Sequence, residues 1–109
     1  MIIYNPGDIV LVDFIQFNTS LRKKRPALVI LDTGDNDVVL APITTRERNG
    51  VGDYKLKNWK NCGLLKDSWL RLSKVSCLQK NDISCKLGEI TDIDMDNICN
   101  IWQELYLLK

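Results

Sequence analysis

The 109-residue sequence contains no histidine, few prolines and glycines, and no long apolar run. Histidine is the usual general base near neutral pH and the commonest metal ligand, so an enzyme with this sequence works without either. No apolar stretch approaches the roughly 20 residues needed to span a bilayer. The N-terminal MIIYNPGD reaches a proline and an aspartate too early for a signal peptide. We therefore expect a cytoplasmic protein that does not contact a membrane.

Cysteine is present but never in a C-x-x-C pair; the four residues are Cys62, Cys77, Cys85 and Cys99. Structural zinc sites usually draw on closely spaced cysteine or histidine pairs, so we expect no metal. Two disulfides are the alternative in a secreted domain, but nothing in the sequence indicates export. We predict reduced, buried thiols and no cofactor.

Length and composition suit a single folded domain over residues 1–109, without repeats or linkers. The formal net charge of +1 conceals an uneven distribution. Residues 55–80 carry seven cations against one anion, Asp67, whereas residues 81–109 carry two cations against six acids. A basic middle of this kind can bind a polyanion, or can be a solvated lysine-rich face.

Short β-branched runs bounded by turn residues predict a series of strands. They cover residues 8–14, 25–32 and 37–44, with shorter candidates at 54–59, 68–72, 74–78 and 83–87. Both faces of 8–14 are largely apolar, which is typical of a strand covered on both sides or of a tight barrel wall. Asp13 is the exception, and it points the same way as Ile9 and Leu11.

The C-terminal segment has helical rather than strand periodicity. Thr91 is a suitable N-cap, and the aspartates that follow it favour a helix N-terminus. Apolar residues then repeat at helical spacing: Ile98, Ile101, Trp102, Leu105 and Leu108. Short strands followed by one amphipathic helix predict a mainly β fold, a small β-barrel with a C-terminal helix.

The turn signal TGDN predicts that strands 25–32 and 37–44 form a hairpin. A hairpin places the start of its first strand opposite the end of its second, so Arg25 and Thr44 are expected to be neighbours. Pro26 suits the first position of a strand and biases Arg25 to extended geometry, which aims the arginine side chain.

Several segments occur in an order that resembles the MazF/PemK family of toxins from bacterial toxin–antitoxin systems. They are GDIVLVDF, RPALVI, APITT, GLLKDSWLRLSKVSCL and KLGEIT, and the similarity covers nearly the whole chain. The resemblance implies an SH3-like barrel, as in MazF, PemK and CcdB toxins, that forms a homodimer. It also implies metal-independent cleavage of single-stranded RNA, chiefly mRNA, leaving 2′,3′-cyclic phosphate and 5′-hydroxyl ends. Growth inhibition and neutralisation by a cognate antitoxin would follow.

Arg25 and Thr44 match the family's catalytic pair. An arginine fork can bind the charge that develops on the equatorial phosphate oxygens, and its pKa above about 12 makes it a poor proton donor. Thr44 can hydrogen-bond the phosphate or orient the 2′-hydroxyl. The sequence alone also allows Arg25 to be a strand-end charge paired with an acid, and Thr44 a hydroxyl that satisfies the backbone.

Other residues are predicted to bind RNA around this pair, and residues 15–24 to form a flap loop. The predicted RNA-binding residues are Thr19, Ser20, Lys23, Lys24, Thr45, Ser68, Trp69 and Arg71. Some family members place an aspartate where this chain has Ser73, so Asp13 is a candidate acid or base helper. Trp59, surrounded by lysines, has a better claim to exposure than Trp69 or Trp102.

Two alternatives to an RNA-cleaving enzyme stay open. One is a non-catalytic toxin of the same fold that inhibits DNA gyrase, similar to CcdB, which would not need Arg25 and Thr44 together. The other is a plain RNA-binding barrel whose cations only hold the strand. Neither alternative predicts cleavage by the purified protein.

Overall fold

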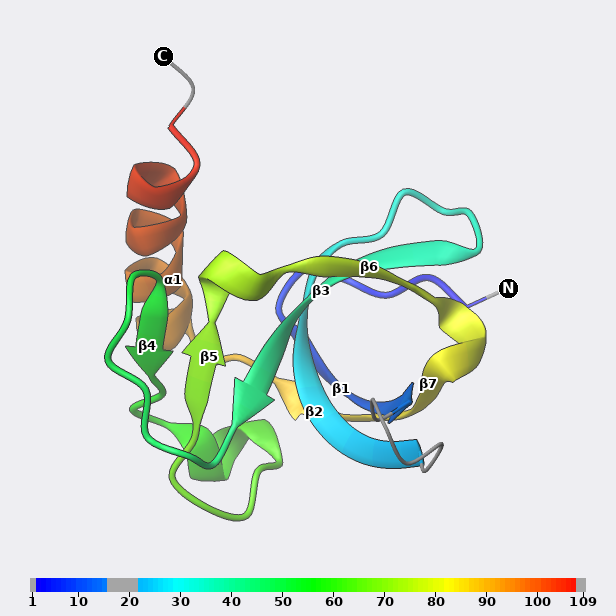
Figure 1. Cartoon of the computed structure of the whole chain (residues 1–109), viewed down its shortest axis with the longest axis horizontal. Helices are drawn as coiled ribbons and strands as arrows, with labels where there is room; N and C mark the ends of the chain where they lie inside the picture. The colour runs from blue at the N-terminus through cyan, green and yellow to red at the C-terminus, as the bar shows by residue number, and fades with distance from the viewer. Residues whose placement is uncertain (1, 16–21, 108–109) are drawn as a thin grey trace.

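The computed structural model describes residues 2–15 and 22–107, which form seven strands, three short 3₁₀ helices and one α-helix (Figure 1). The longer strands are β1 (Asp8–Ile15), β2 (Arg22–Leu31), β3 (Asp37–Thr44) and β7 (Ile83–Glu89). The shorter ones are β4 (Asp53–Lys55), β5 (Trp69–Arg71) and β6 (Ser76–Gln79). The 3₁₀ helices are η1 (Trp59–Cys62), η2 (Leu72–Lys74) and η3 (Lys80–Asp82), and the α-helix is α1 (Asp92–Leu105). The predicted mainly β fold with one C-terminal helix is confirmed.

The strands form one antiparallel sheet in the order β4-β5-β3-β2-β1-β7, with β6 added to β3. β3 changes partner along its length, because its residues 37–40 pair with β6 and its residues 43–44 pair with β5. The sheet curls into a barrel-like shape, with α1 lying on the same side as β4 and β5 (Figure 1). Among the described residues β4 and β7 do not pair with each other, so the sheet stays open.

β1 and β2 extend further than the sequence pattern predicts. Their pairing continues to Ile15 opposite Arg22, so the ends of the predicted flap, residues 15–24, belong to strands. Pro26 therefore lies inside β2 and not at its start. The pairing of β2 with β3 begins one residue later, at Ala27 opposite Pro42, which fits a position without a backbone N–H to donate.

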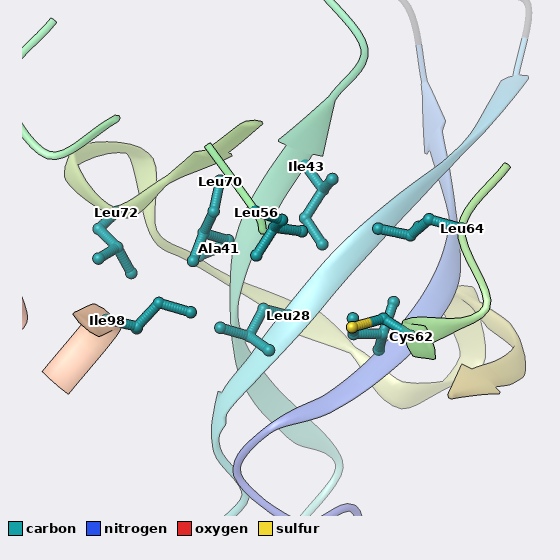
Figure 2. Close-up of a cluster of buried hydrophobic side chains, with 10 residues drawn as sticks. Leu28, Ala41, Ile43, Leu56, Cys62, Leu64, Leu70, Leu72 and Ile98 are labelled. Carbon is teal, nitrogen blue, oxygen red and sulfur yellow. The ribbon is translucent and has the colours of Figure 1, made fainter. Parts of the chain in front are cut away.

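Apolar side chains cover both faces of the central sheet, as the pattern of residues 8–14 predicts. One core lies between the sheet and α1, where Ile98 reaches toward Leu28 (Figure 2). The second core, on the opposite face, consists of Val10, Val12, Ala27, Val29, Val38 and Leu40. Ile101, Trp102 and Leu105 pack against the first core, so the predicted apolar face of the helix is confirmed over the described part of the chain. None of the helices within residues 2–15 and 22–107 has the length and hydropathy needed to cross a membrane.

A buried carboxylate joins α1 to the segment after β4. Asp94 is fully buried; it accepts hydrogen bonds from the Tyr54 hydroxyl at 2.6 Å and from the backbone N–H groups of Lys57 and Asn58, both at 3.0 Å. Burial alone would raise the pKa of Asp94, but these hydrogen bonds outweigh it and hold the pKa below its ordinary value of 3.8. Thr91 occupies the N-cap position, where its hydroxyl contacts Asp94 and Asn58 instead of a helix N–H.

The four cysteines are free, in agreement with the predicted reduced thiols, but the prediction that they are buried is wrong for three of them. Cys62 is buried, and burial raises the pKa of its thiol. Cys77, Cys85 and Cys99 are exposed. Cys77 and Cys85 lie on β6 and β7, and a short apolar run does not reveal which face of such a strand is covered.

Gly63 is required where the turn after η1 passes β7. Its φ of 84° is left-handed, and a Cβ at this position would overlap the backbone carbonyl of Leu87. Gly34 is a matched control, because its φ is 92° but the nearest atom to a Cβ is 3.9 Å away. We expect Gly34→Ala to lower the free energy of unfolding by about 1–2 kcal/mol, and Gly63→Ala by about 1–3 kcal/mol more. Chemical denaturation of both variants tests this; equal losses would contradict the close approach.

Candidate active site

Arg25 of β2 and Thr44, the last residue of β3, lie just beyond the point where these two strands stop pairing with each other. The β2–β3 pairing ends at Ala27 opposite Pro42, and continuing that register by two residues places Arg25 opposite Thr44. Side chains alternate along a strand, so both residues share the face of Ala27, which is the face of the second core. Arg25 is half-buried and lies opposite Val12 of β1. The arginine therefore marks the point where this core ends.

The Thr44 hydroxyl is already oriented by its own turn. Its Oγ1 accepts a hydrogen bond from the backbone N–H of Arg46 at 3.1 Å. The backbone-satisfying role that the sequence allowed is thus present. Because the oxygen acts as the acceptor, the hydroxyl hydrogen can still be donated to an oxyanion.

A row of side chains continues from Thr44 across the next two strands. Thr44 pairs with Trp69 of β5, and Trp69 pairs with Lys55 of β4. The Lys55 ammonium lies 5.4 Å from the centroid of the Trp69 ring, a cation–π contact. The row places a hydroxyl, an indole and a cation side by side on the face that carries Arg25.

Two predicted RNA-binding residues are engaged within the protein. Ser68 is buried and its hydroxyl donates to the carbonyl of Lys66 at 2.9 Å. Arg71 forms an ion pair with Asp53, with Nε 3.2 Å from Oδ1, and the Asp53 side chain is only 1% exposed. Arg71 therefore balances a buried carboxylate, and only the rest of its guanidinium is available to a ligand.

Asp13 does not lie on the same face as Arg25. It pairs directly with Lys24, whereas Arg25 pairs with Val12. Strand alternation places Asp13 and Lys24 on one face and Lys23 and Arg25 on the other. Asp13 lies one residue beyond the partner of Arg25 on β1, so its side chain points to the opposite face of the sheet. The structure therefore does not bring the candidate acid–base helper to the arginine.

The remaining predicted residues fall in two groups. Lys23 and Lys24 are exposed on β2, and Thr45 is exposed directly after Thr44. Thr19 and Ser20 lie outside the residues that the structure describes. Thr45 also borders a cleft of about 410 Å³ with largely apolar walls, which include Leu11, Pro26 and Leu87.

Lys55 was not predicted from the sequence, although it ends the row that begins at Thr44. Its position depends on the register of β4 against β5, which joins residues on either side of η1. The KLKNWK segment was the available signal, since it places three lysines within four residues of one indole. Within the described part of the chain, no group of three or more cysteine or acidic side chains is arranged to hold a metal ion.

Comparisons with known proteins agree with this fold. A family model described as "PemK-like, MazF-like toxin of type II toxin-antitoxin system" matches residues 5–106. Among solved structures, an endoribonuclease from mycobacterial species is 18% identical with a TM-score of 0.74, covering 95% of this chain and 91% of its own. The Mycobacterium tuberculosis toxin MazF-mt6 is 17% identical with a TM-score of 0.75, covering 94% and 98%.

A MazE–MazF complex from Deinococcus radiodurans gives a similar result. It is 14% identical with a TM-score of 0.77, and the match covers 99% of this chain and 100% of that one. No curated protein sequence matches the chain. At these identities the structural matches establish the fold, and the family model establishes the family.

Proposed function

Because the chain belongs to the family of PemK-like, MazF-like toxins of type II toxin–antitoxin systems, we propose that it is an endoribonuclease that cleaves single-stranded RNA, chiefly mRNA, without a metal ion. The observation that carries the proposal is the β2–β3 register, whose last pair is Ala27 and Pro42; continued by two residues, it sets Arg25 and Thr44 level on one face. Trp69 and Lys55 extend that face with an indole and a cation, the two groups that suit a base and a phosphate.

The proposed step is an internal transesterification. The 2′-hydroxyl loses its proton and its oxygen bonds to phosphorus, while the bond from phosphorus to the 5′-oxygen breaks and that oxygen gains a proton. The products are a 2′,3′-cyclic phosphate and a 5′-hydroxyl. Arg25 stabilises the charge that develops on the equatorial oxygens through its fixed fork of donors. Thr44 donates its hydroxyl hydrogen to the same phosphate or positions the 2′-hydroxyl.

We further propose that a cytoplasmic homodimer of this chain is the active form and that a cognate antitoxin protein inhibits it. Large apolar side chains are exposed near the N-terminus and at the end of β2, at Ile2, Ile3 and Leu31, and such groups often mark protein interfaces. The apolar cleft beside Thr45 suits an apolar side chain of an antitoxin. Light scattering of the purified chain, alone and with its antitoxin, measures both associations.

Labelled single-stranded RNA incubated with the purified protein in EDTA tests the proposal against its two alternatives. The proposal predicts discrete fragments. A gyrase inhibitor or a plain RNA-binding barrel would leave the RNA intact at any protein concentration.

Thr44→Val is expected to lower the rate constant of cleavage by roughly tenfold to a hundredfold, the range for losing one hydrogen bond to a charged group. Thr44→Ser keeps both the hydroxyl donor and the acceptor for the Arg46 N–H, so it should stay within a fewfold of the wild type. Single-turnover kinetics, with thermal unfolding as the folding control, measure the effect. Equal rates for the valine and serine variants would contradict a role for the hydroxyl.

A further inference from the structure

A second group of cations surrounds an indole beyond β4, outside the candidate pair. Two clefts share the Trp59 side chain as a wall, with volumes of about 410 and 470 Å³. Their other charged lining residues are Lys55, Lys57, Lys60 and Asp67. With three lysines against one aspartate, the pair of clefts favours an anionic ligand.

Trp59 is held firmly enough to serve as a platform. The indole is half-buried and packs against the first core, while the Lys60 ammonium lies 5.4 Å from the centroid of its ring. The preceding residue, Asn58, donates its backbone N–H to the buried Asp94 at 3.0 Å. The start of η1 is thus fixed to α1, and the position of the indole does not depend on a free loop.

Lys55 connects this platform to the candidate pair. It is the last member of the row that runs from Thr44 through Trp69, and it also lines the nearer of the two clefts at Trp59. Hydroxyl, indole, lysine and a second indole therefore follow one another from the end of β3 to η1. This order matches a polymer that alternates bases and phosphates.

We propose that Trp59, Lys57 and Lys60 form an outlying RNA subsite that binds a nucleotide some distance along the strand from the scissile phosphate. The base stacks on the Trp59 indole and the two lysines contact neighbouring phosphates. The inference rests on the proposed function and extends it, because substrates that reach this subsite gain affinity while the chemistry at Arg25 is unchanged. An acidic peptide would use the lysines but has no need of an indole on each side of Lys55.

Binding of uncleavable 2′-O-methyl RNA of mixed sequence tests the subsite separately from cleavage. Two probes are needed, a long strand that reaches Trp59 and a trinucleotide that does not. Trp59→Leu keeps an apolar side chain in the core and removes the stacking face, and it should weaken binding of the long strand by roughly five- to a hundredfold. Trp59→Phe should recover part of the loss. Trinucleotide binding should not change in either variant.

The lysines provide a second readout that does not depend on core packing. Lys57→Ala/Lys60→Ala should reduce the slope of log affinity for the long strand against log salt by about 1.4, which corresponds to two phosphate contacts on a single strand. Lys74→Ala, an exposed lysine in η2 at the far end of β5 from Trp69, should leave the slope unchanged.

The outcomes separate the subsite from the proposed function. The subsite would be overturned if the lysine variant bound the long strand with unchanged affinity and an unchanged salt slope. It would also be overturned if the Trp59→Leu and lysine variants weakened binding of the antitoxin but not of RNA. A wild-type protein that binds the long strand through Trp59 but cuts no RNA would overturn the proposed function and leave the subsite standing. If the Trp59→Leu protein does not fold, the affinity and salt slope of the Lys57→Ala/Lys60→Ala variant test the subsite without it.

Discussion

Replacing Arg25 with alanine is expected to lower the rate constant of RNA cleavage by a factor of about 10² to 10³, the loss seen when one well-placed donor to a developing oxyanion is removed. The guanidinium is rooted in a paired stretch of β2, opposite Val12, so its direction is set by the sheet. Arg25→Lys keeps the charge but not the fork of donors, and should restore only part of the rate.

Single-turnover cleavage at saturating enzyme, in EDTA, isolates this effect from substrate binding. Lys74→Ala is the matched control, since it removes an exposed cation from η2, at the far end of β5 from Trp69, and should cleave at the wild-type rate. If the Arg25→Ala protein folds and cuts RNA as fast as the wild type, the assignment of Arg25 is wrong.

Asp94→Asn is expected to lower the free energy of unfolding by about 2–4 kcal/mol at neutral pH. The carboxylate accepts bonds on both oxygens, from Tyr54 and Lys57 on Oδ1 and from Asn58 on Oδ2. An asparagine side chain has one oxygen, so its amide would face a donor and leave a buried N–H or O–H without a partner. Because Asp94 ties α1 to the segment before η1, the loss should appear as reduced global stability.

The difference in free energy of unfolding between the wild type and Asp94→Asn should depend on pH, and this dependence identifies the carboxylate as the cause. The pKa of Asp94 lies below its ordinary value of 3.8, so its contribution is complete above the unfolded-state pKa and decreases as the pH falls through the folded-state pKa. The stability gap between wild type and Asp94→Asn should be constant at neutral pH and narrow below about pH 4. Urea unfolding across this range measures it. A gap that does not change down to the lowest pH would contradict the prediction.

Tyr54→Phe separates the contribution of the phenol hydroxyl from the rest of the network. The half-buried phenol donates to Asp94 Oδ1; burial, together with the bond to Asp94, raises the pKa of Tyr54 to about 12. Removing the hydroxyl takes away this donor, and also the acceptor of the Asn97 side-chain amide at 3.0 Å, and leaves the two backbone donors in place. We expect a loss of about 1 kcal/mol, smaller than that of Asp94→Asn in the same unfolding experiment. An equal loss would mean that the backbone bonds contribute little.

The features that the sequence predicts well are those set by local geometry. Arg25 and Thr44 lie on the two strands of one hairpin. The TGDN turn and the alternating apolar residues determine which positions of those strands face each other. The observed β2–β3 register agrees with that expectation. The helix was predictable for the same reason, because its cap residue, first-turn acids and apolar face all lie within one segment.

The features that the sequence does not predict depend on contacts between distant segments. Asp94 accepts its shortest hydrogen bond from Tyr54, forty residues earlier, and looks in sequence like any first-turn acid. Arg71 is paired by Asp53 across the β4–β5 register. Ser68 is a polar residue beside a short strand, and only the packing of the segment around it makes it buried. No local pattern in the sequence reveals that these side chains have partners within the protein.

The most direct test of the account is cleavage of an RNA in which the nucleotide before the scissile bond is changed to its 2′-deoxy form. The account predicts that the unmodified RNA yields a 2′,3′-cyclic phosphate and a 5′-hydroxyl in EDTA, that the deoxy strand is not cut at that bond, and that Arg25→Ala cuts neither strand at an appreciable rate. Cleavage of the deoxy strand at the same bond, or fragments that carry 5′-phosphate ends, would contradict it.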